Sequence, residues 1–401
     1  MKLSSLHLEH FRNYTRLDFV FPQEPIVVLS GENAQGKTNF LEAIYMMALT
    51  KSFRVSDREF LKQFEESYYR IEAKGEGSSG DDLHLELAEL HEPKNMRVLK
   101  KNGVKISAPK FIGNLKVVLF RPEDLQMLTD EPAGRRKYLN TILIQTVPGY
   151  MKQLQTYQKL LTQRNALLLQ IKQQKMSGSA SSTGSLLDLF DEQLAEAGSA
   201  LLTSRLELVE FLKSQLQIEG SPYTIDYLSS IFYDVDLCPG KEWNRDINNE
   251  YGNSDQLQAR ARNDLQSYFQ EALTAARPRD LRSTHTSVGP HRDDLKLKIN
   301  HQPLELTASR GELRSALMEL KKAEIAWITT KTQDTPLILL DDIFSELDSN
   351  RKNDLFDLLP HDAQIIMTIA EGNPLPTSLT THPKLRSAST VRKIHAGQIH
   401  L

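Results

Sequence analysis

Short apolar segments separated by polar residues dominate the start of the chain. Apolar positions cluster at residues 3–8, 17–21 and 26–29, in runs too short for helices, so the pattern predicts three strands. Residues 38–49 then show helical spacing. Leu83, Leu85 and Leu87 alternate with polar neighbours, and Asn102-Gly103 is a two-residue hairpin signal. This part of the chain therefore predicts strands that lead into one helix, followed by an antiparallel β meander.

The apolar spacing changes after a strand-like run at residues 117–120. From residue 134 onward the spacing is helical, and Leu154, Tyr157, Leu161 and Leu168 share one face. Further helices are expected at residues 186–216 and 255–276, with a flexible Ser/Gly-rich turn at 176–185 and a helix end before Pro278. Residues 336–340 are uninterruptedly apolar, as is typical of a central parallel strand. Residues 390–399 predict a closing edge strand.

Charge and length limit the class of protein. With 401 residues, the chain exceeds one typical domain, and a net charge of −3 excludes a uniformly basic nucleic-acid-binding protein. Any DNA contact must then depend on local clusters. Arg135-Arg136-Lys137 and the pair Lys51 and Arg54 are candidates, although each is equally compatible with a solvated helix face.

Cysteine usage and hydropathy indicate a cytoplasmic protein without a membrane partner. The single cysteine, Cys238, excludes an internal disulfide and fits a reducing compartment. No apolar run reaches the roughly 18 residues that span a bilayer, and the first residues lack a secretory pattern. We therefore expect a soluble protein.

A glycine-rich phosphate loop lies between the third predicted strand and the first predicted helix. Its glycines turn backbone N–H groups toward phosphate oxygens, and the helix N-terminus adds its dipole. Lys37 is expected to reach the β and γ phosphates, and the Thr38 hydroxyl is expected to bind Mg²⁺. The expected nucleotide-binding residues of this loop are Gly31, Glu32, Asn33, Ala34, Gln35, Gly36, Lys37 and Thr38.

Two carboxylates follow the apolar strand at residues 336–340. A buried carboxylate is costly unless a cation pairs with it, so Asp341 is expected to hold Mg²⁺. Asp342 is then placed to orient or deprotonate the attacking water, with Lys37 as the second catalytic residue. Taken alone, the two residues could also simply open a turn. Together with the phosphate loop, they predict an ATP site split across the sequence.

A second anion-binding turn is expected at residues 308–315. Ser309 and Gly311 precede a helical pattern, and such a turn presents N–H groups and a hydroxyl at a helix N-terminus. An ordinary helix cap on Ser309 is the simpler interpretation. The phosphate loop in the same chain favours a phosphate-binding role, as in ATPases that hold ATP between two copies.

Several collinear motifs resemble those of the RecF family of bacterial DNA replication and repair ATPases. They are Phe11-Arg12-Asn13-Tyr14, the phosphate loop with its following helix, residues 118–125, residues 157–165, residues 289–295 and residues 340–348. The resemblance covers essentially the whole chain. It implies an α/β fold: an ABC-type P-loop ATPase head with an antiparallel β meander and an inserted all-α helical domain. The expected domains are residues 1–130 and 282–401 for the head and 131–281 for the insertion.

The resemblance also implies a function. ATP would join two copies into a homodimer, with Ser309 and Gly311 on the partner's γ-phosphate, Arg12 in the nucleotide site, and Glu346-Leu347-Asp348 facing the partner. The implied partners are single-stranded, gapped or junction DNA and other recombination mediator proteins of gap repair, in a pathway linked to the SOS response. Slow ATP hydrolysis would act as a release switch.

The sequence departs from the family pattern at three places. Glu312 replaces the usual glutamine after the signature glycine and adds negative charge there. ABC-type heads carry a glutamine in a coupling loop that senses nucleotide. At the corresponding place this chain has Arg121 and, a few residues later, Gln126, and either could take that role. Relatives are rich in threonine near residues 367–370, whereas this chain has only Thr368 there. The sequence therefore does not identify the switch residue.

Other classes of protein account less well for these motifs. A transporter ATPase subunit would need a shorter helical region and a histidine switch, and a phosphotransferase would lack the second turn. A metal site at His285, His291, Asp293 and Asp294 is disfavoured because their spacing fits no common ligand set.

Overall fold

The computed structural model describes residues 1–77, 80–91, 95–176, 184–217, 221–233, 255–345, 352, 355–356, 359–371 and 389–400. The chain divides into two compact units. The first unit contains Met1–Leu128, Ile144–Thr146 and Ala308–Leu401, and the second contains Thr129–Leu143 and Val147–Thr307.

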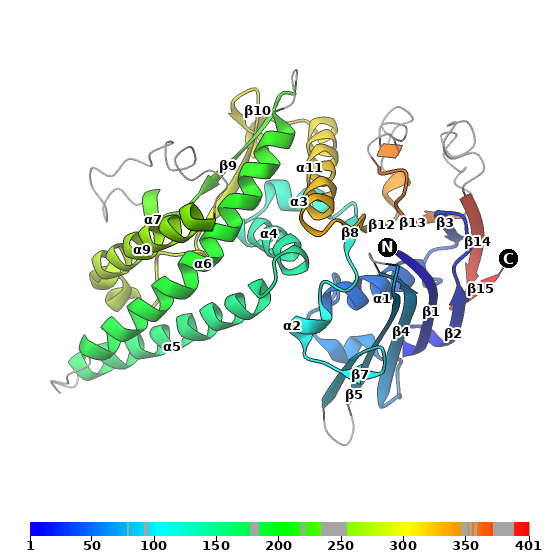
Figure 1. Cartoon of the computed structure of the whole chain (residues 1–401), viewed down its shortest axis with the longest axis horizontal. Coiled ribbons are helices and arrows are strands. Elements are labelled where there is room, and N and C mark those ends of the chain that lie inside the picture. Colours follow the sequence, from blue (N-terminus) through cyan, green and yellow to red (C-terminus); the bar gives the residue numbers. More distant parts are fainter. Residues whose placement is uncertain are drawn as a thin grey trace. The chain divides into compact units, whose positions relative to one another are not determined.

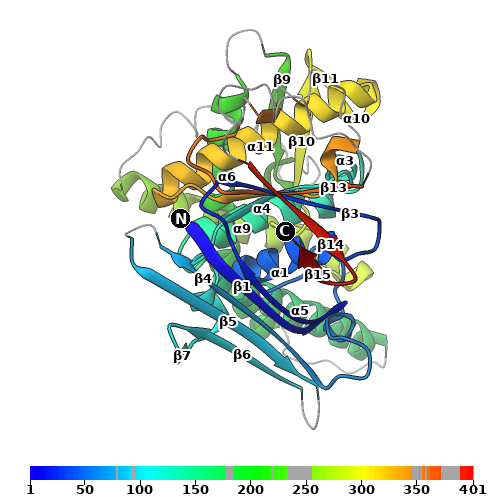
Figure 2. The same ribbon diagram turned by 90° about the vertical axis from the view of Figure 1, so that its right-hand side faces the viewer.

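An antiparallel sheet forms one half of the first unit. Its strands are β1 (Lys2–Phe11), β2 (Tyr14–Val20), β4 (Tyr68–Glu76), β5 (Asp82–Leu90), β6 (Met96–Lys101) and β7 (Val104–Lys105). They lie in the order β2-β1-β4-β5-β6-β7, and Figure 2 shows the long strands side by side. Asn102 and Gly103 both have positive φ, which suits the two-residue turn between β6 and β7. The expected meander and its hairpin are confirmed.

A mostly parallel sheet forms the other half. Its strands are β3 (Ile26–Gly31), β8 (Val117–Phe120), β12 (Leu337–Leu340), β13 (Ile365–Ala370), β14 (Ser389–His395) and β15 (Gln398–His400), in the order β15-β14-β3-β13-β12-β8. Every residue of β8 and β12 is buried, which explains their uninterrupted apolar sequences. The single strand expected at residues 390–399 is wrong. A turn at Ala396 and Gly397, both at positive φ, splits it into the β14–β15 hairpin.

Helix α1 (Lys37–Leu49) lies between the two sheets of the first unit. It contacts β4 and β5 of the antiparallel sheet and β3, β8 and β13 of the parallel sheet. Burial on both sides explains why the helix is apolar almost all round. The long helix α11 (Arg310–Thr332) follows the second expected anion-binding turn. The shorter elements are α2 (Ala108–Phe111), α3 (Asp124–Thr129), η1 (Arg58–Leu61) and η2 (Ile343–Ser345).

Three long helices build the second unit. Helices α5 (Tyr150–Met176), α6 (Gly184–Leu216) and α9 (Asp255–Ser283) pack against one another, as Figure 1 shows. Among the described residues, this unit also contains α7 (Ser230–Tyr233), α10 (Leu304–Thr307) and all but the last three residues of α4 (Pro132–Thr146). The Ser/Gly-rich turn expected at 176–185 falls largely on residues 177–183, outside the described part of the chain, and Cys238 also lies outside it.

Helix α9 does not end before Pro278, contrary to the sequence prediction. It continues to Ser283 with the proline inside it. A proline normally breaks a helix because it lacks an N–H and crowds the preceding turn. Here Arg277 pairs with Asp191 of α6 and Asp280 pairs with Arg164 of α5, so ion pairs hold the helix on both sides of the proline.

A three-stranded sheet belongs to the second unit, which is therefore not purely helical. Strand β10 (Asp294–Ile299) pairs antiparallel with β9 (Tyr223–Leu228) and β11 (Gln302–Pro303). Because β10 adds to a strand of the insertion, residues 282–307 fall in the second unit, whereas the sequence assigned them to the head. The pairing of two segments about seventy residues apart carries no local sequence signal.

Candidate nucleotide-binding site

The phosphate loop connects the end of β3 to the start of α1. Gly36 has φ 115°, and a Cβ there would lie 2.7 Å from Nδ2 and 2.9 Å from Oδ1 of Asn13. Ala34 is also in the left-handed region, with φ 65°. Only glycine fits at position 36, because its backbone has a positive φ and because the side chain of Asn13 leaves no room for a Cβ. A tight turn at the start of a helix is the geometry on which anion-binding loops rely.

Lys37 lies folded into this loop. Its Nζ donates to the carbonyl oxygen of Gly31 at 2.6 Å and to that of Glu32 at 2.7 Å, and the residue is 8% exposed. Burial lowers the pKa of Lys37, while the carboxylates of Asp342 and Asp341 oppose the shift. The ammonium group is therefore held where a phosphate charge would offset its burial.

The two halves of the predicted site meet at a hydrogen bond. The Thr38 hydroxyl donates to Oδ1 of Asp341 at 2.9 Å, although 303 positions separate the residues. Parallel pairing of β13 with β3 and of β12 with β13 brings the ends of these strands to one edge of the sheet. The structure thus joins the phosphate loop to the acidic strand end, as the sequence implied.

Asp341 has the surroundings of a carboxylate that holds a cation. Burial raises the pKa of Asp341, and the hydroxyls of Thr38 and Thr368 counter the shift by donating to Oδ1. Within the described residues, no hydrogen bond reaches Oδ2. A hydroxyl and a carboxylate side by side are oxygen ligands of the kind that Mg²⁺ prefers, so these residues fit that ion.

Asp342 follows in a left-handed conformation, with φ 49°. Its N–H donates to the Thr368 hydroxyl at 2.9 Å, and its carbonyl accepts from the Ser345 hydroxyl at 2.7 Å. A non-glycine residue is held in this region only when its surroundings fix it. The backbone that carries the expected water-orienting carboxylate is therefore fixed on both sides.

A shell of amides around the phosphate loop was not predicted. Asn13 Nδ2 donates to the carbonyl of Gln35 at 2.9 Å, Asn39 donates to Asn13 Oδ1 at 2.8 Å, and the Tyr14 hydroxyl donates to the carbonyl of Gly36 at 2.9 Å. Asn13 and Tyr14 follow β1, whose sequence carries no phosphate-binding pattern. Their one signal was the shared motif around Arg12.

The β14–β15 hairpin closes the other side of the loop. The N–H of Ala396 donates to Oε1 of Gln35 at 2.6 Å, and the N–H of Gly397 donates to the Gln35 carbonyl at 3.2 Å. A Cβ on Gly397 would lie 2.6 Å from the carbonyl oxygen of Asn13. The turn that splits the expected edge strand thus places two donors on Gln35.

Arg12 lies beside α1 and is engaged with the protein. Its Nε and one terminal nitrogen both donate to the buried carboxylate of Glu42 at 2.8 Å, and the other terminal nitrogen donates to the carbonyl of Phe60 at 2.7 Å. These hydrogen bonds orient Arg12 on the helix that begins with Lys37. Its expected contact with nucleotide stays a prediction.

Ser309 caps α11 in a reciprocal capping box. The Ser309 hydroxyl accepts from the N–H of Glu312, while the Glu312 carboxylate accepts from the N–H of Ser309 at 2.8 Å and from its hydroxyl at 2.7 Å. These hydrogen bonds lower the pKa of Glu312. No hydrogen bond joins Ser309 or Gly311 to the phosphate loop in the part of the chain described. The expected partner-facing residues Glu346-Leu347-Asp348 lie outside that part.

Two other predicted groups belong to the internal structure of the second unit. Arg135 is 3% exposed, with both Nε and a terminal nitrogen on the carboxylate of Asp294, so its prediction as a DNA-phosphate contact is wrong. A bidentate carboxylate saturates the guanidinium face that would meet a phosphate. His291 accepts from the Tyr157 hydroxyl at 2.7 Å and donates to the Thr286 carbonyl at 3.0 Å, so both ring nitrogens have protein partners.

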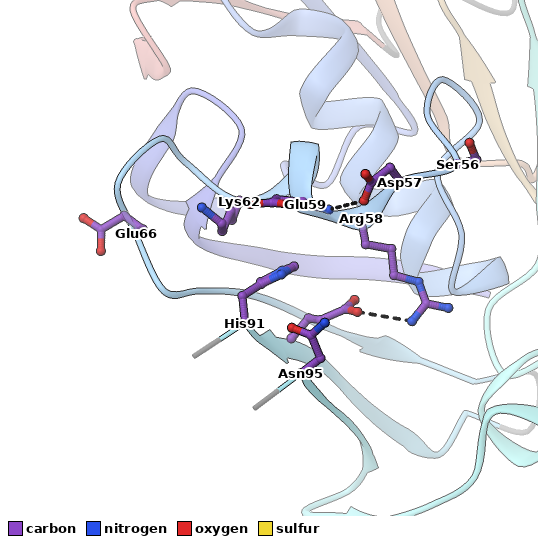
Figure 3. Close-up of a pocket in the computed structure, with 9 residues that line it drawn as sticks. Ser56, Asp57, Arg58, Glu59, Lys62, Glu66, His91 and Asn95 are labelled. Carbon is purple, nitrogen blue, oxygen red and sulfur yellow. Dashed lines mark hydrogen bonds and ion pairs between the residues drawn. The ribbon is translucent and has the colours of Figure 1, made fainter. Parts of the chain in front are cut away.

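A separate cavity of about 490 Å³ lies beside η1 in the first unit (Figure 3). Its lining includes the carboxylates of Asp57, Glu59, Glu66 and Glu89. Arg58 pairs with Glu89 at 3.1 Å, and Asp57 accepts from the N–H of Glu59. No residue of the phosphate loop lines this cavity, so it is distinct from the nucleotide site.

Comparison with known proteins gives one family. The family described as RecF/RecN/SMC N terminal domain matches residues 2–376. The chain is 33% identical over 392 residues to the DNA replication and repair protein RecF of Enterococcus faecalis, covering 96% of each protein. It is 31% identical to the protein of the same name from Bacillus thuringiensis, covering 98% of this chain and 96% of that protein.

Solved structures agree in both fold and sequence. The recombination mediator protein RecF of the RecFOR pathway, solved with ATP, is similar with a TM-score of 0.81 and 28% identity, covering 99% of this chain and 96% of that one. A second structure of a RecF protein in the same pathway gives the same TM-score and identity.

Proposed function

Because this chain belongs to the RecF proteins of the RecF/RecN/SMC family, we propose that it is an ATP-dependent DNA-binding protein of DNA replication and recombinational gap repair. ATP joins two copies into a dimer, the dimer binds single-stranded or gapped DNA, and slow hydrolysis releases it. The observation that carries this proposal is the hydrogen bond between Thr38 and Asp341, which brings together the two distant motifs from which we expect one nucleotide site.

Each group of residues in the proposed site has a separate role. The N–H groups of residues 31–38 and the Lys37 ammonium hold the phosphates, and Thr38 with Asp341 holds Mg²⁺. When bound, Mg²⁺ neutralises charge on the phosphate oxygens. Asp342 orients the attacking water from its fixed left-handed turn. The γ-phosphate is expected to be contacted from the other copy by Ser309 and Gly311.

The ATP-dependent dimer is the first prediction to test. Light scattering should give a molar mass that doubles only when ATP and Mg²⁺ are both present. Lys37→Met should abolish the doubling because it removes the phosphate ligand. Ser309→Arg should also abolish the doubling of the molar mass. The long cationic side chain would displace the turn at the start of α11, which is proposed to contact the ATP bound by the other copy.

Matched controls separate these effects from misfolding. Lys322→Met at a half-buried helix position and Ser214→Arg at an exposed one make the same chemical changes away from the site and should dimerise like the wild type. Circular dichroism checks the helix content of every variant. A mass that stays monomeric in the wild type, or a Lys37→Met protein that still doubles, would contradict the proposal.

DNA binding is tested on single-stranded, gapped and fully duplex oligonucleotides of equal length. Affinity should require ATP, should be higher for the first two substrates, and should fall steeply with salt because phosphate contacts release counterions. The turnover number should lie below about 1 s⁻¹, at the low end for enzymes, as suits a switch.

The alternative classes predict different outcomes. A phosphotransferase would bind ATP as a monomer and transfer phosphate to a small acceptor. A transporter subunit would associate with a membrane component. Within the described residues, no helix is both long and apolar enough to span a membrane.

A further inference from the structure

Thr368 is the one polar residue in the buried strand β13. Its neighbours in Ile365–Ala370 are apolar, and Thr368 is 1% exposed. A buried hydroxyl is costly unless it is hydrogen-bonded, so its partners explain why a polar residue is tolerated there.

Strand register determines those partners. Leu340 of β12 lies opposite Met367 of β13, so the next residues along the two parallel strands, Asp341 and Thr368, lie side by side at the edge where β12 ends. On its other side, β13 pairs with β3, with Thr368 opposite Leu29. Thr368 is therefore fixed within the sheet that also carries the phosphate loop.

The Thr368 hydroxyl uses both of its hydrogen-bonding capacities on the acidic pair. It donates to Oδ1 of Asp341 at 2.9 Å and accepts from the N–H of Asp342 at 2.9 Å. The first bond fixes the rotation of the Asp341 carboxylate, whose Oδ1 also accepts from Thr38. The second holds Asp342 in its left-handed turn.

We propose that Thr368 is a positioning residue of the nucleotide site, whose hydroxyl sets the Asp341 carboxylate for Mg²⁺ and the Asp342 backbone for the attacking water. The inference rests on the proposed function, because it assumes that Asp341 holds the ion of an ATP site. Groups that orient a metal ligand typically alter metal affinity by about 10-fold to 100-fold when they are removed.

The test measures binding of a fluorescent ATP analogue as Mg²⁺ is titrated, independently of hydrolysis. Thr368→Val keeps the shape of the side chain and removes the hydroxyl. It should raise the half-saturating Mg²⁺ concentration about 10-fold or more, with little change in nucleotide binding in the absence of Mg²⁺. Thr368→Ser keeps the hydroxyl and should stay within about twofold of the wild type, a rescue that a purely steric role would not give.

Two further variants make the result specific. Thr332→Val removes a hydroxyl that donates to the Ile328 carbonyl at the end of α11, and it should behave like the wild type. In an Asp341→Ala background, Thr368→Val should add no further loss, because Thr368 acts on the ion through Asp341. If Thr368→Val is too unstable to purify, Thr368→Ala takes its place, with Mg²⁺-free nucleotide binding as the measure of folding.

The outcomes separate this inference from the function on which it depends. An unchanged Mg²⁺ requirement in Thr368→Val, or an equal loss in the Asp341→Ala background, overturns the role of Thr368 while the nucleotide site stands. A wild-type protein that binds no nucleotide overturns both.

Discussion

At the scale of single residues, His291 is held neutral by its surroundings. Burial lowers its pKa to about 4, with the hydrogen bond to the Thr286 carbonyl opposing the shift. The carbonyl can only accept, so Nε2 carries the proton and Nδ1 accepts from Tyr157. The pKa of His291 is lower in the folded state than in the unfolded state. Neutral His291 therefore contributes its full stability to the fold above about pH 6.5, and that contribution is lost as the pH falls toward about 4.

His291→Gln isolates that contribution. Glutamine can donate to Thr286 and accept from Tyr157, but it does not take up a proton in this range. Between about pH 7 and about pH 5, the wild type should lose about 2 kcal/mol more unfolding free energy than the variant. Urea titrations followed by circular dichroism measure this difference. Parallel losses in the two proteins would show that His291 already titrates normally in the folded state.

Buried ion pairs in the second unit show where single-residue reasoning from sequence fails. Arg164 is fully buried and pairs with Asp191 and Asp280, while Arg135 pairs with Asp294. In the sequence these arginines are indistinguishable from surface cations, since their partners lie far along the chain. The meeting of Thr38 with Asp341 was predictable because the phosphate loop has fixed local spacing and the strand before Asp341 is continuously apolar.

At the scale of elements, the capping box of α11 places a carboxylate on the proposed phosphate-binding turn. Glu312 occupies both the N–H and the hydroxyl of Ser309. Glu312→Gln keeps the box, since glutamine also serves at this position of it, but removes the charge that a partner's γ-phosphate would approach in the proposed dimer. The variant should form the ATP-dependent dimer at a roughly fivefold lower protein concentration, because a like charge on the proposed phosphate-binding turn is removed.

Glu319→Gln serves as the control, because it makes the same change on the same helix away from the turn. Light scattering over a concentration series measures the protein concentration at which each variant dimerises. Added salt should reduce the difference between the two concentrations, because it screens the charge of Glu312. Weaker dimerisation of Glu312→Gln would mean that the carboxylate supports the turn rather than opposing the phosphate.

Elements with local periodicity were predictable from the sequence, and elements that depend on distant pairing were not. Strands β1 to β3, helix α1 and the β6–β7 hairpin follow from alternation, apolar runs and a turn dipeptide. The β9–β10–β11 sheet and the course of α9 past Pro278 depend on partners many residues away. Tertiary contacts overrode local preference at both places.

At the scale of the whole chain, the division into two units predicts an uneven response to nucleotide. The phosphate loop, Asp341 and the α11 turn all lie in the first unit. A ligand stabilises what it binds by about 2.7 kcal/mol at 100 times its dissociation constant. Hydrogen exchange with ATP and Mg²⁺ should therefore slow in β3, β12 and β13, while the amides of α5 and α9 should exchange as before.

Lys37→Met provides the baseline for this comparison, since it should show no nucleotide effect in either unit. Equal protection of both units would mean that they open as one cooperative body.

The β14–β15 hairpin has a consequence for how the protein is made. Its contacts with Gln35 span 361 positions, so the phosphate loop leaves the ribosome long before the segment that closes it is synthesised. At roughly 5–20 residues per second, that interval lasts tens of seconds. During that interval, a nascent chain carries a phosphate loop without its final support, and β3 lacks its sheet neighbours β13 and β14. The contacts that fix Gln35 of the phosphate loop on this side therefore form only when synthesis is nearly finished.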